Sequence, residues 1–532
     1  MGAGVSAVSK ETNEAISTLP AAAQAELKAL ASPYIRTSLP QPVKEVQEDA
    51  SKTCVQRVQE ALAQIEKSEG DLNACIEICK ESALKLAKEA DEKIAGGATR
   101  RPLEGVPLLV KGNVDVKGTL TTAGMEGFAG WKPEATAPVA QALIDAGAIT
   151  IAKTTLPEAA FGMWGWSKLH GLTRNPFNTK YSAGGSSTGS AVGLAAGYGT
   201  LAIGSDTEGS MRGPAEYAGV VGLRPTLGRY SDKGIIPCNI ARDTAGLMAC
   251  TVADVAVMDA IVTGAAIGDY VAADLSAIKV AMPKDWAGLA ASDGTKKALE
   301  LASAAFKGAG ATVNKEVGDF KPLLKSPVAA VESLVDKLSF RSEGLGDYIA
   351  SHQGEGVANK FPLTLPEVTA KSFYPNVKKF FDAPVMPGAV PMINILEKKG
   401  TDEYTELKTK YEAEVQSMAD QFTKYFDDNG VDVILSPCTS GPPNAAMTMA
   451  EHGDPASFMP LIMGSLAKYA PIFGLNAVPI PSITMPTTAK HENPELGGGP
   501  MPAGILLWAR PKDDKKLLEV AMALEVALAA AK

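Results

Sequence analysis

The segment YSAGGSSTGSAVGLAAGYGTLAIGSDTEGSMRGPAEYAGVVGLRPT runs from Tyr181 to Thr226 and is dense in glycine, alanine and serine. Within it, Ser187 to Ala196 predicts a helix of small residues, and Leu201-Ala202-Ile203 predicts a strand after it. A phosphate cradle would need a Gly-rich turn before a helix. The GxxxxGK[ST] pattern is absent, and so is a convincing GxGxxG unit with a later acid.

A flexible Gly/Ser linker is the second interpretation of this segment. The charged residues Asp206 and Arg212 and the apolar run from Ala215 to Leu223 argue against it, because they indicate a folded core. The third interpretation is a nucleophilic serine, which needs a base to remove its proton. Since His170 is the only histidine close to the segment in sequence, a neutral lysine is the alternative base.

Lys111 is the candidate for that lysine. A free lysine has a pKa of about 10.4, and burial without a carboxylate partner lowers it. Lys111 directly follows Pro107-Leu108-Leu109-Val110, which predicts a buried strand. It therefore lies either at the end of a strand as a buried amine or at the surface as the start of a loop.

Strands and helices alternate outward from the central segment. Further strands are expected at 107–110, 149–152, 279–281, 431–435, 480–485 and 505–508, and further helices at 138–146, 252–262 and 515–530. This alternation predicts the α/β class: a single large α/β/α layered domain with a mixed, mainly parallel central sheet covered by helices.

The domain organisation follows from changes in composition and hydrophobic pattern along the chain. Residues 1–42 predict a partly disordered N-terminal tail, and residues 43–532 predict the one folded domain. Within that domain, 43–95 predicts N-terminal helices, 105–285 the catalytic core, and 320–470 helices and loops that face the substrate.

The N-terminal helices have a break at Asp71-Leu72-Asn73, after which a second helix is expected to continue to the Gly96-Gly97 pair. Cys75 and Cys79 are four residues apart on this second helix, so they are expected to share its face as small apolar residues.

Composition and charge exclude several classes of protein. The net charge of −9 argues against an electrostatic nucleic-acid binder, so no nucleic-acid partner is expected. Six cysteines without a CxxC pair predict free thiols in a reducing compartment, and we expect a cytoplasmic protein. The four histidines have no metal-ligand spacing, which predicts no metal, and no cofactor is expected.

Membrane contact is expected to be weak. No run of 18 apolar residues occurs, so no transmembrane segment is predicted, and the N-terminus lacks the pattern of a secretory signal. The start MGAGVS fits the N-myristoylation pattern at Gly2, although a disordered tail of small residues is the preferred interpretation. One myristoyl chain would give only reversible peripheral association.

Three blocks of the sequence resemble the amidase signature family. GVPLLVKGNVDV at 105–116 resembles its lysine block, GGSS at 184–187 its relay-serine block, and GSDTEGSMR at 204–212 its nucleophile block. Further similar blocks are NP at 175–176, GVVGLRPTLGR at 219–229, DTAG at 243–246, DVILSP at 432–437 and PAGI at 502–505. The resemblance covers the chain from about residue 45 to its end.

The resemblance implies a Ser–Ser–Lys triad. Lys111 acts as base, Ser186 as the proton relay on a cis peptide bond, and Ser210 as the nucleophile that attacks the carbonyl of a carboxamide. The same resemblance implies an oxyanion hole formed by the backbone N–H groups of Thr207, Glu208, Gly209 and Ser210. Each such donor is worth on the order of 3 kcal/mol.

Supporting residues are expected beside the triad. Ser187 is expected to give supporting hydrogen bonds, and Asp206 and Arg212 to form a charge-assisted pair that fixes the loop. The sequence departs from the family at Glu208, where glycine is usual, and at Gly112, where aspartate is usual. The side chain of Glu208 is expected to point away from the oxyanion hole, toward an amine-bearing substrate or a nearby cation.

Three functions remain open at this point. The first is an amidase that hydrolyses a small-molecule amide. The second is the A subunit of a glutamyl-tRNA amidotransferase, which the stretch Phe161 to Trp166 and the long N-terminus fit poorly. The third is a pseudoenzyme, motivated by Glu208. The sequence leaves the substrate and a homodimer undecided.

Overall fold

The computed structural model describes residues 43, 51–239, 242–318, 341–353, 359–372, 400–446, 468–469, 472, 480–491 and 500–530. The predicted tail at 1–42 lies outside the described residues, as does much of the segment 320–470. Among the described helices, none is long and apolar enough to cross a membrane.

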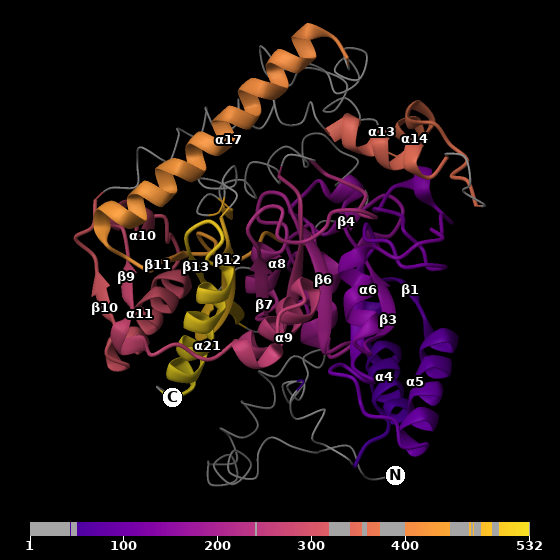
Figure 1. Cartoon of the computed structure of the whole chain (residues 1–532), viewed down its shortest axis with the longest axis horizontal. Coiled ribbons are helices and arrows are strands. Elements are labelled where there is room, and N and C mark those ends of the chain that lie inside the picture. Colours follow the sequence, from indigo (N-terminus) through magenta and orange to yellow (C-terminus); the bar gives the residue numbers. More distant parts are fainter. Residues whose placement is uncertain are drawn as a thin grey trace.

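One eleven-stranded sheet forms the centre of the molecule (Figure 1), in the order β1-β3-β2-β6-β8-β7-β12-β13-β11-β9-β10. Its strands are β1 Cys75–Ile78, β2 Pro107–Lys111, β3 Ile149–Thr154, β6 Leu201–Asp206, β7 Val221–Arg224, β8 Thr244–Ala249, β9 Lys279–Ala281, β10 Thr312–Asn314, β11 Val433–Pro437, β12 Ser482–His491 and β13 Met501–Trp508. A separate two-stranded sheet pairs β4 Trp166–Ser167 with β5 Gly171–Leu172.

Helices cover both faces of the sheet. They are α4 Cys54–Leu72, α5 Lys80–Ala95, α6 Pro138–Asp145, α7 Thr188–Ala196, α8 Arg212–Tyr217, α9 Val252–Thr263, α10 Lys284–Ala287, α11 Asp293–Gly308, α13 Arg341–Ser351, α14 Leu365–Ser372, α17 Asp402–Asn429 and α21 Asp514–Ala530. Short 3-10 turns are η1 Glu126–Phe128, η2 Glu158–Ala160, η3 Ile267–Asp269 and η4 Leu275–Ala277. The predicted α/β class with a mixed sheet is therefore confirmed.

The sheet contains more antiparallel pairing than we expected. β2 is parallel to β3 and β6, and β9 is parallel to β10 and β11, but the other described pairs of this sheet are antiparallel. The expectation of a mainly parallel sheet is wrong because β8, β12 and β13 run against their neighbours. The continuous apolar pattern of these strands shows burial on both faces, which does not by itself give strand direction.

Side chains alternate between two cores along the central strands. In β6, Leu201 and Ile203 join the core under α6, α9, α11 and α21, whereas Ala202 joins the core under α4, α5, α7 and α8. In β2, Leu109 likewise faces the second core. This period of two follows from the pleat of a strand, and it gives the three-layer α/β/α arrangement.

The N-terminal helices are interrupted by a strand. α4 begins with a capping box between Thr53 and Gln56 and ends at Leu72, with Asn73 in the left-handed conformation. The carboxylate of Glu69 then accepts the backbone N–H groups of Ala74 and Cys75, so the chain turns onto the sheet edge. The expected helix at 75–78 is wrong, because β1 pairs there with β3.

Candidate active site

Lys111 is the last residue of β2, and its side chain is wholly buried. Its Nζ lies 2.8 Å from Ser186 Oγ, 2.8 Å from Ser205 Oγ and 3.2 Å from the carbonyl oxygen of Ser205. These described contacts are all to hydroxyl or carbonyl oxygens. Burial lowers the pKa of Lys111 to about 7, and the more distant charge of Asp206 only partly opposes it.

Ser186 lies in the loop between β5 and α7, where it is wholly buried. The peptide bond between Gly185 and Ser186 is cis. The hydroxyl of Tyr469 accepts the N–H of Gly185 at 3.2 Å. A Cβ on Gly185 would lie 2.4 Å from the carbonyl oxygen of Gly162, so this position accepts only glycine without rearrangement. The loop that carries Ser186 is therefore held on both sides.

Ser187 connects this loop to the loop of Ser210. Its N–H donates to the carbonyl oxygen of Ser210 at 2.7 Å, and its Oγ donates to the carbonyl oxygen of Ser205 at 3.0 Å. The same Oγ accepts the N–H of Ser205 at 3.2 Å. Ser210 itself is buried, with 9% of its surface exposed. The structure thus brings the loops of Ser186 and Ser210 into direct contact beside Lys111.

Asp206 organises the loop that carries Ser210, the candidate nucleophile, at the end of β6; this loop is called the nucleophile loop below. Its carboxylate accepts the N–H groups of Gly209 at 2.8 Å and Met211 at 3.0 Å. It also receives two hydrogen bonds from Arg212, each at 3.0 Å, and one from Arg224 at 3.0 Å. Burial alone would raise the pKa of Asp206, but the two guanidinium groups outweigh it and hold the pKa well below its usual value.

The predicted oxyanion-hole residues are not equivalent in the structure. The N–H of Gly209 is directed to Asp206. The N–H groups of Thr207, Glu208 and Ser210 have no hydrogen-bond partner among the described residues. They are accordingly the better placed candidates for a developing oxyanion.

Glu208 points to a cation. Its carboxylate pairs with the guanidinium of Arg242, which is 3% exposed, whereas the side chain of Glu208 is 19% exposed. Glu208 is also absent from the described residues with positive φ, so its backbone has no need for glycine. The carboxylate is therefore not aimed at the loop's own N–H groups.

Sequence reasoning missed four residues around this site. Ser205 contacts Lys111 directly, and Asn113 donates to Ser205 Oγ at 3.2 Å and to the carbonyl oxygen of Ile236 at 3.1 Å. The other two are Arg224 and Arg242. Polar residues inside apolar strand segments, such as Ser205 in β6, were the available signal. His170 instead contacts Thr122.

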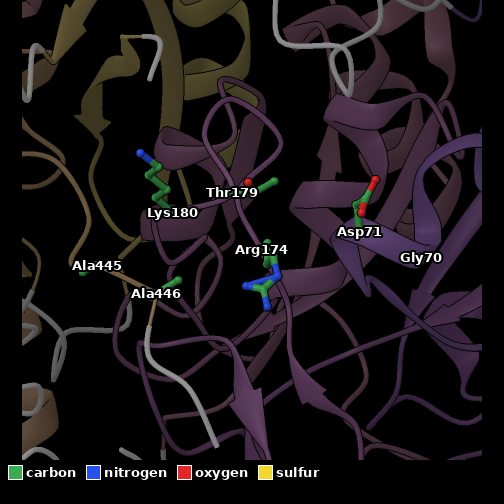
Figure 2. Close-up of a pocket in the computed structure, with 7 residues that line it drawn as sticks. All are labelled: Gly70, Asp71, Arg174, Thr179, Lys180, Ala445 and Ala446. Atoms are coloured by element: carbon green, nitrogen blue, oxygen red, sulfur yellow. The ribbon is translucent and has the colours of Figure 1, made fainter. Parts of the chain in front are cut away.

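A cavity of about 610 Å³ lies outside this site (Figure 2). It is lined by Gly70, Asp71, Arg174, Thr179, Lys180, Ala445 and Ala446. Figure 2 shows Arg174 between Asp71 on one side and Ala446 on the other. Lys111, Ser186 and Ser210 are not among the residues that line it, so it is not the candidate active site. Within the described residues, no cluster of three or more metal-type ligands occurs.

The fold and these contacts define an α/β enzyme of the amidase type, with a buried lysine beside two serine-bearing loops. The Amidase family model matches residues 56–518, and the chain belongs to this family. The predicted membership, and with it the predicted amidase activity, is confirmed.

Relatives with different activities are similar to the chain. Mandelamide hydrolase of Pseudomonas putida is 30% identical over 464 residues, which cover 86% of this chain and 84% of the relative. The A subunit of glutamyl-tRNA(Gln) amidotransferase from Lachnospira eligens is 33% identical over 402 residues, which cover 72% of this chain and 79% of the relative. The structure of the native peptide amidase of Stenotrophomonas maltophilia superposes with a TM-score of 0.71 at 26% identity. The superposition covers 94% of this chain and 98% of the peptide amidase.

Proposed function

We propose that this amidase cleaves the C–N bond of a small carboxamide through an acyl-enzyme on Ser210, with Ser186 as relay and Lys111 as base. The observation that carries the proposal is the 2.8 Å contact between Lys111 Nζ and Ser186 Oγ in a wholly buried setting. A lysine with a pKa of about 7 is substantially neutral at neutral pH.

The contacts of Lys111 match the needs of a neutral amine, which has two N–H groups and one lone pair. The two N–H groups can donate to Ser205 Oγ and to the carbonyl oxygen of Ser205. The lone pair then remains for the O–H of Ser186, which is the direction of proton transfer that a base requires.

The chemical steps conserve every proton. Lys111 takes the proton of Ser186 as Ser186 takes that of Ser210, and Ser210 Oγ attacks the amide carbonyl. The tetrahedral oxyanion forms near the N–H groups of Thr207, Glu208 and Ser210. The proton returns from Lys111 through Ser186 to the leaving amine, because an amine anion is a very poor leaving group. A water molecule then cleaves the ester along the same path and releases the acid.

Turnover of a panel of aliphatic, aryl and fatty amides tests the proposal. Wild-type protein should release ammonia or amine from at least one amide. Ser210→Ala and Lys111→Ala should each lose turnover by at least about 10³-fold while the fold is retained. Persistent turnover in Ser210→Ala would exclude this nucleophile.

The A subunit of a glutamyl-tRNA amidotransferase is the second candidate function, supported by the 33% identity to such a protein. It predicts hydrolysis of glutamine and no other amide, and dependence on a partner protein. Activity of the isolated chain on several amides would decide against it. The third interpretation of the sequence, a pseudoenzyme, loses its motive because the carboxylate of Glu208 pairs with Arg242. Failure of a fluorophosphonate to label Ser210 would bring it back.

The wider assignments also remain proposals. We propose one catalytic domain at 43–532 and a cytoplasmic location. Myristoylation of Gly2 and a homodimer are further hypotheses. Incorporation of an alkynyl myristate that is lost in Gly2→Ala tests the first of these, and light scattering of the purified protein tests the second.

A further inference from the structure

We infer that Arg242 is a positioning residue for the reaction: it neutralises Glu208, which would otherwise place a negative charge inside the oxyanion segment. This inference rests on the proposed function, because it concerns the oxyanion formed beside Ser210. Glu208 lies between Thr207 and Gly209, and its own N–H is one of the three candidate donors. An unpaired carboxylate there would repel the oxyanion that these donors stabilise.

The ion pair is sheltered from water. Arg242 is 3% exposed and Glu208 is 19% exposed. Exposed ion pairs typically contribute little, but removal of one partner from a buried pair leaves a charge without compensation. The loss of Arg242 would therefore act on the electrostatics of the site and not only on local packing.

The backbone around Arg242 is fixed to the nucleophile loop. Its carbonyl oxygen accepts a hydrogen bond from Arg224 at 2.9 Å, and Arg224 also contacts Asp206. The next residue, Asp243, accepts the hydroxyl of Thr207 at 2.5 Å. The guanidinium of Arg242 thus reaches Glu208 from a segment that already contacts the start of the loop, directly at Thr207 and through Arg224 at Asp206.

Among the described contacts that the loop and its partners make, three carboxylates meet three guanidinium groups, so this set is neutral when Lys111 is neutral. The three carboxylates belong to Asp206, Glu208 and Asp243, and the three guanidinium groups belong to Arg212, Arg224 and Arg242. The oxyanion is then the new net charge that appears during acylation. Loss of Arg242 would leave the loop with a net negative charge before the reaction begins.

Kinetics on a p-nitrophenyl ester of a short fatty acid, as an activated acyl substrate, test the inference. Arg242→Leu should lower kcat on the order of 100-fold with a much smaller change in KM, because the ground-state carbonyl is neutral and the transition state is not. Glu208→Gln in the same background should restore most of kcat, since it removes the uncompensated charge. Arg242→Lys, which keeps a cation, should retain kcat within about tenfold.

A matched control separates charge placement from stability. Arg101 pairs with the 7%-exposed Glu104 at 2.6 Å, and Arg101→Leu should leave kcat unchanged even if it lowers the melting temperature. If Arg242→Leu does not fold, Arg242→Gln replaces it in the same comparison with Glu208→Gln.

The outcomes distinguish the inference from the proposed function. A wild-type protein that neither turns over esters nor reacts with a fluorophosphonate contradicts the proposed function. An active wild type whose Arg242→Leu variant keeps its kcat overturns the inference alone. The same holds if Glu208→Gln does not improve that variant, because a purely structural role of Arg242 would show no such rescue.

Discussion

Lys111 at the end of β2 is predicted to give the enzyme a defined pH dependence. Because burial lowers its pKa to about 7, the neutral base becomes more populated as the pH rises through this value. We predict that kcat/KM increases with pH with a midpoint close to 7. Initial rates on an amide substrate between pH 5.5 and 9 measure it.

A second buried lysine provides the control for this measurement. Lys153 in β3 is also wholly buried, and burial lowers its pKa to about 8. It contacts the carbonyl oxygen of Val114 and the hydroxyl of Thr121 and neither candidate serine. Lys153→Met should leave the midpoint of the profile in place. A wild-type profile without a rise near pH 7 would argue against Lys111 as the base.

Asp206 is predicted to stabilise the fold as well as the loop. In Asp206→Asn, the guanidinium groups of Arg212 and Arg224 lose their carboxylate in a site that water does not reach. We expect a loss of about 3–5 kcal/mol in the free energy of unfolding, measured by urea denaturation. Asp274→Asn, at an exposed carboxylate that accepts from Ser276, should leave the curve unchanged. Equal curves for wild type and Asp206→Asn would refute this role.

Gly209 combines a positive φ of 100° with a crowded position, since a Cβ would lie 2.7 Å from the side chain of Ile472. We predict that Gly209→Ala shifts the nucleophile loop and lowers kcat by at least about tenfold. Gly228 has a φ of 80° with nothing within 4 Å of a Cβ. Gly228→Ala therefore controls for backbone strain alone and should keep kcat. Equal kcat values for Gly209→Ala and Gly228→Ala would contradict this prediction.

At the residue scale, the sequence indicated the candidate residues better than it indicated their neighbours in the fold. Lys111 follows an apolar strand, so its burial was foreseeable. The contacts of Lys111 with Ser205 and of Glu208 with Arg242 were not foreseen, because they join residues 94 and 34 positions apart. Hydrophobic periodicity gives the face of an element, but it does not give the partner across the core.

At the scale of elements, long regular helices and apolar strands were predictable. α9, α21, β2, β6 and β9 lie where their patterns placed them. The strand β1 was predicted as helix because tertiary contacts set its extended conformation. These contacts are the hydrogen bond that Glu69 accepts from the backbone and the pairing with β3. Such pairing overrides weak local preference.

Helix α13 is held against the segment that carries Asp115 and Trp131 by a buried tyrosine. The hydroxyl of Tyr348 donates to Asp115 at 2.8 Å and accepts from the indole N–H of Trp131 at 3.1 Å. We predict that Tyr348→Phe weakens this docking by about 1–2 kcal/mol, because both partners lose a hydrogen bond in a buried site. Limited proteolysis should then cut α13 about 5–30 times faster.

Ser351→Ala is the control on the same helix, since the Ser351 hydroxyl donates to the carbonyl oxygen of Tyr348 within α13. Its cleavage rate should match that of the wild type. Cleavage of Tyr348→Phe at the wild-type rate would show that packing alone holds the helix.

At the scale of the whole molecule, the six cysteines are free, and five of them are buried. Burial raises the pKa of Cys54 to about 12 and that of Cys79 to about 11. We predict slow reaction of the native protein with Ellman's reagent and six thiols per chain after unfolding without reductant. A count below six would show a disulfide that the structure does not contain.

The layered architecture was predictable from the alternation of helices and strands, and the direction of β12 and β13 was not. Their antiparallel register brings Ile483 opposite Leu507 across the sheet, far from the central segment in sequence. The loops of Ser186 and Ser210 nevertheless adjoin α7 and β6, which lie within that segment, although Tyr469, Arg224 and Arg242 also hold them. The site could therefore be predicted more fully than the sheet that surrounds it.

The most direct test of the account is to locate the covalent adduct of a fluorophosphonate by peptide mass spectrometry and to measure its rate of formation. We predict one adduct on Ser210, none in Ser210→Ala, and a rate at least about 100-fold lower in Lys111→Met. An adduct on another residue, or an unchanged rate without the amine of Lys111, would contradict the account.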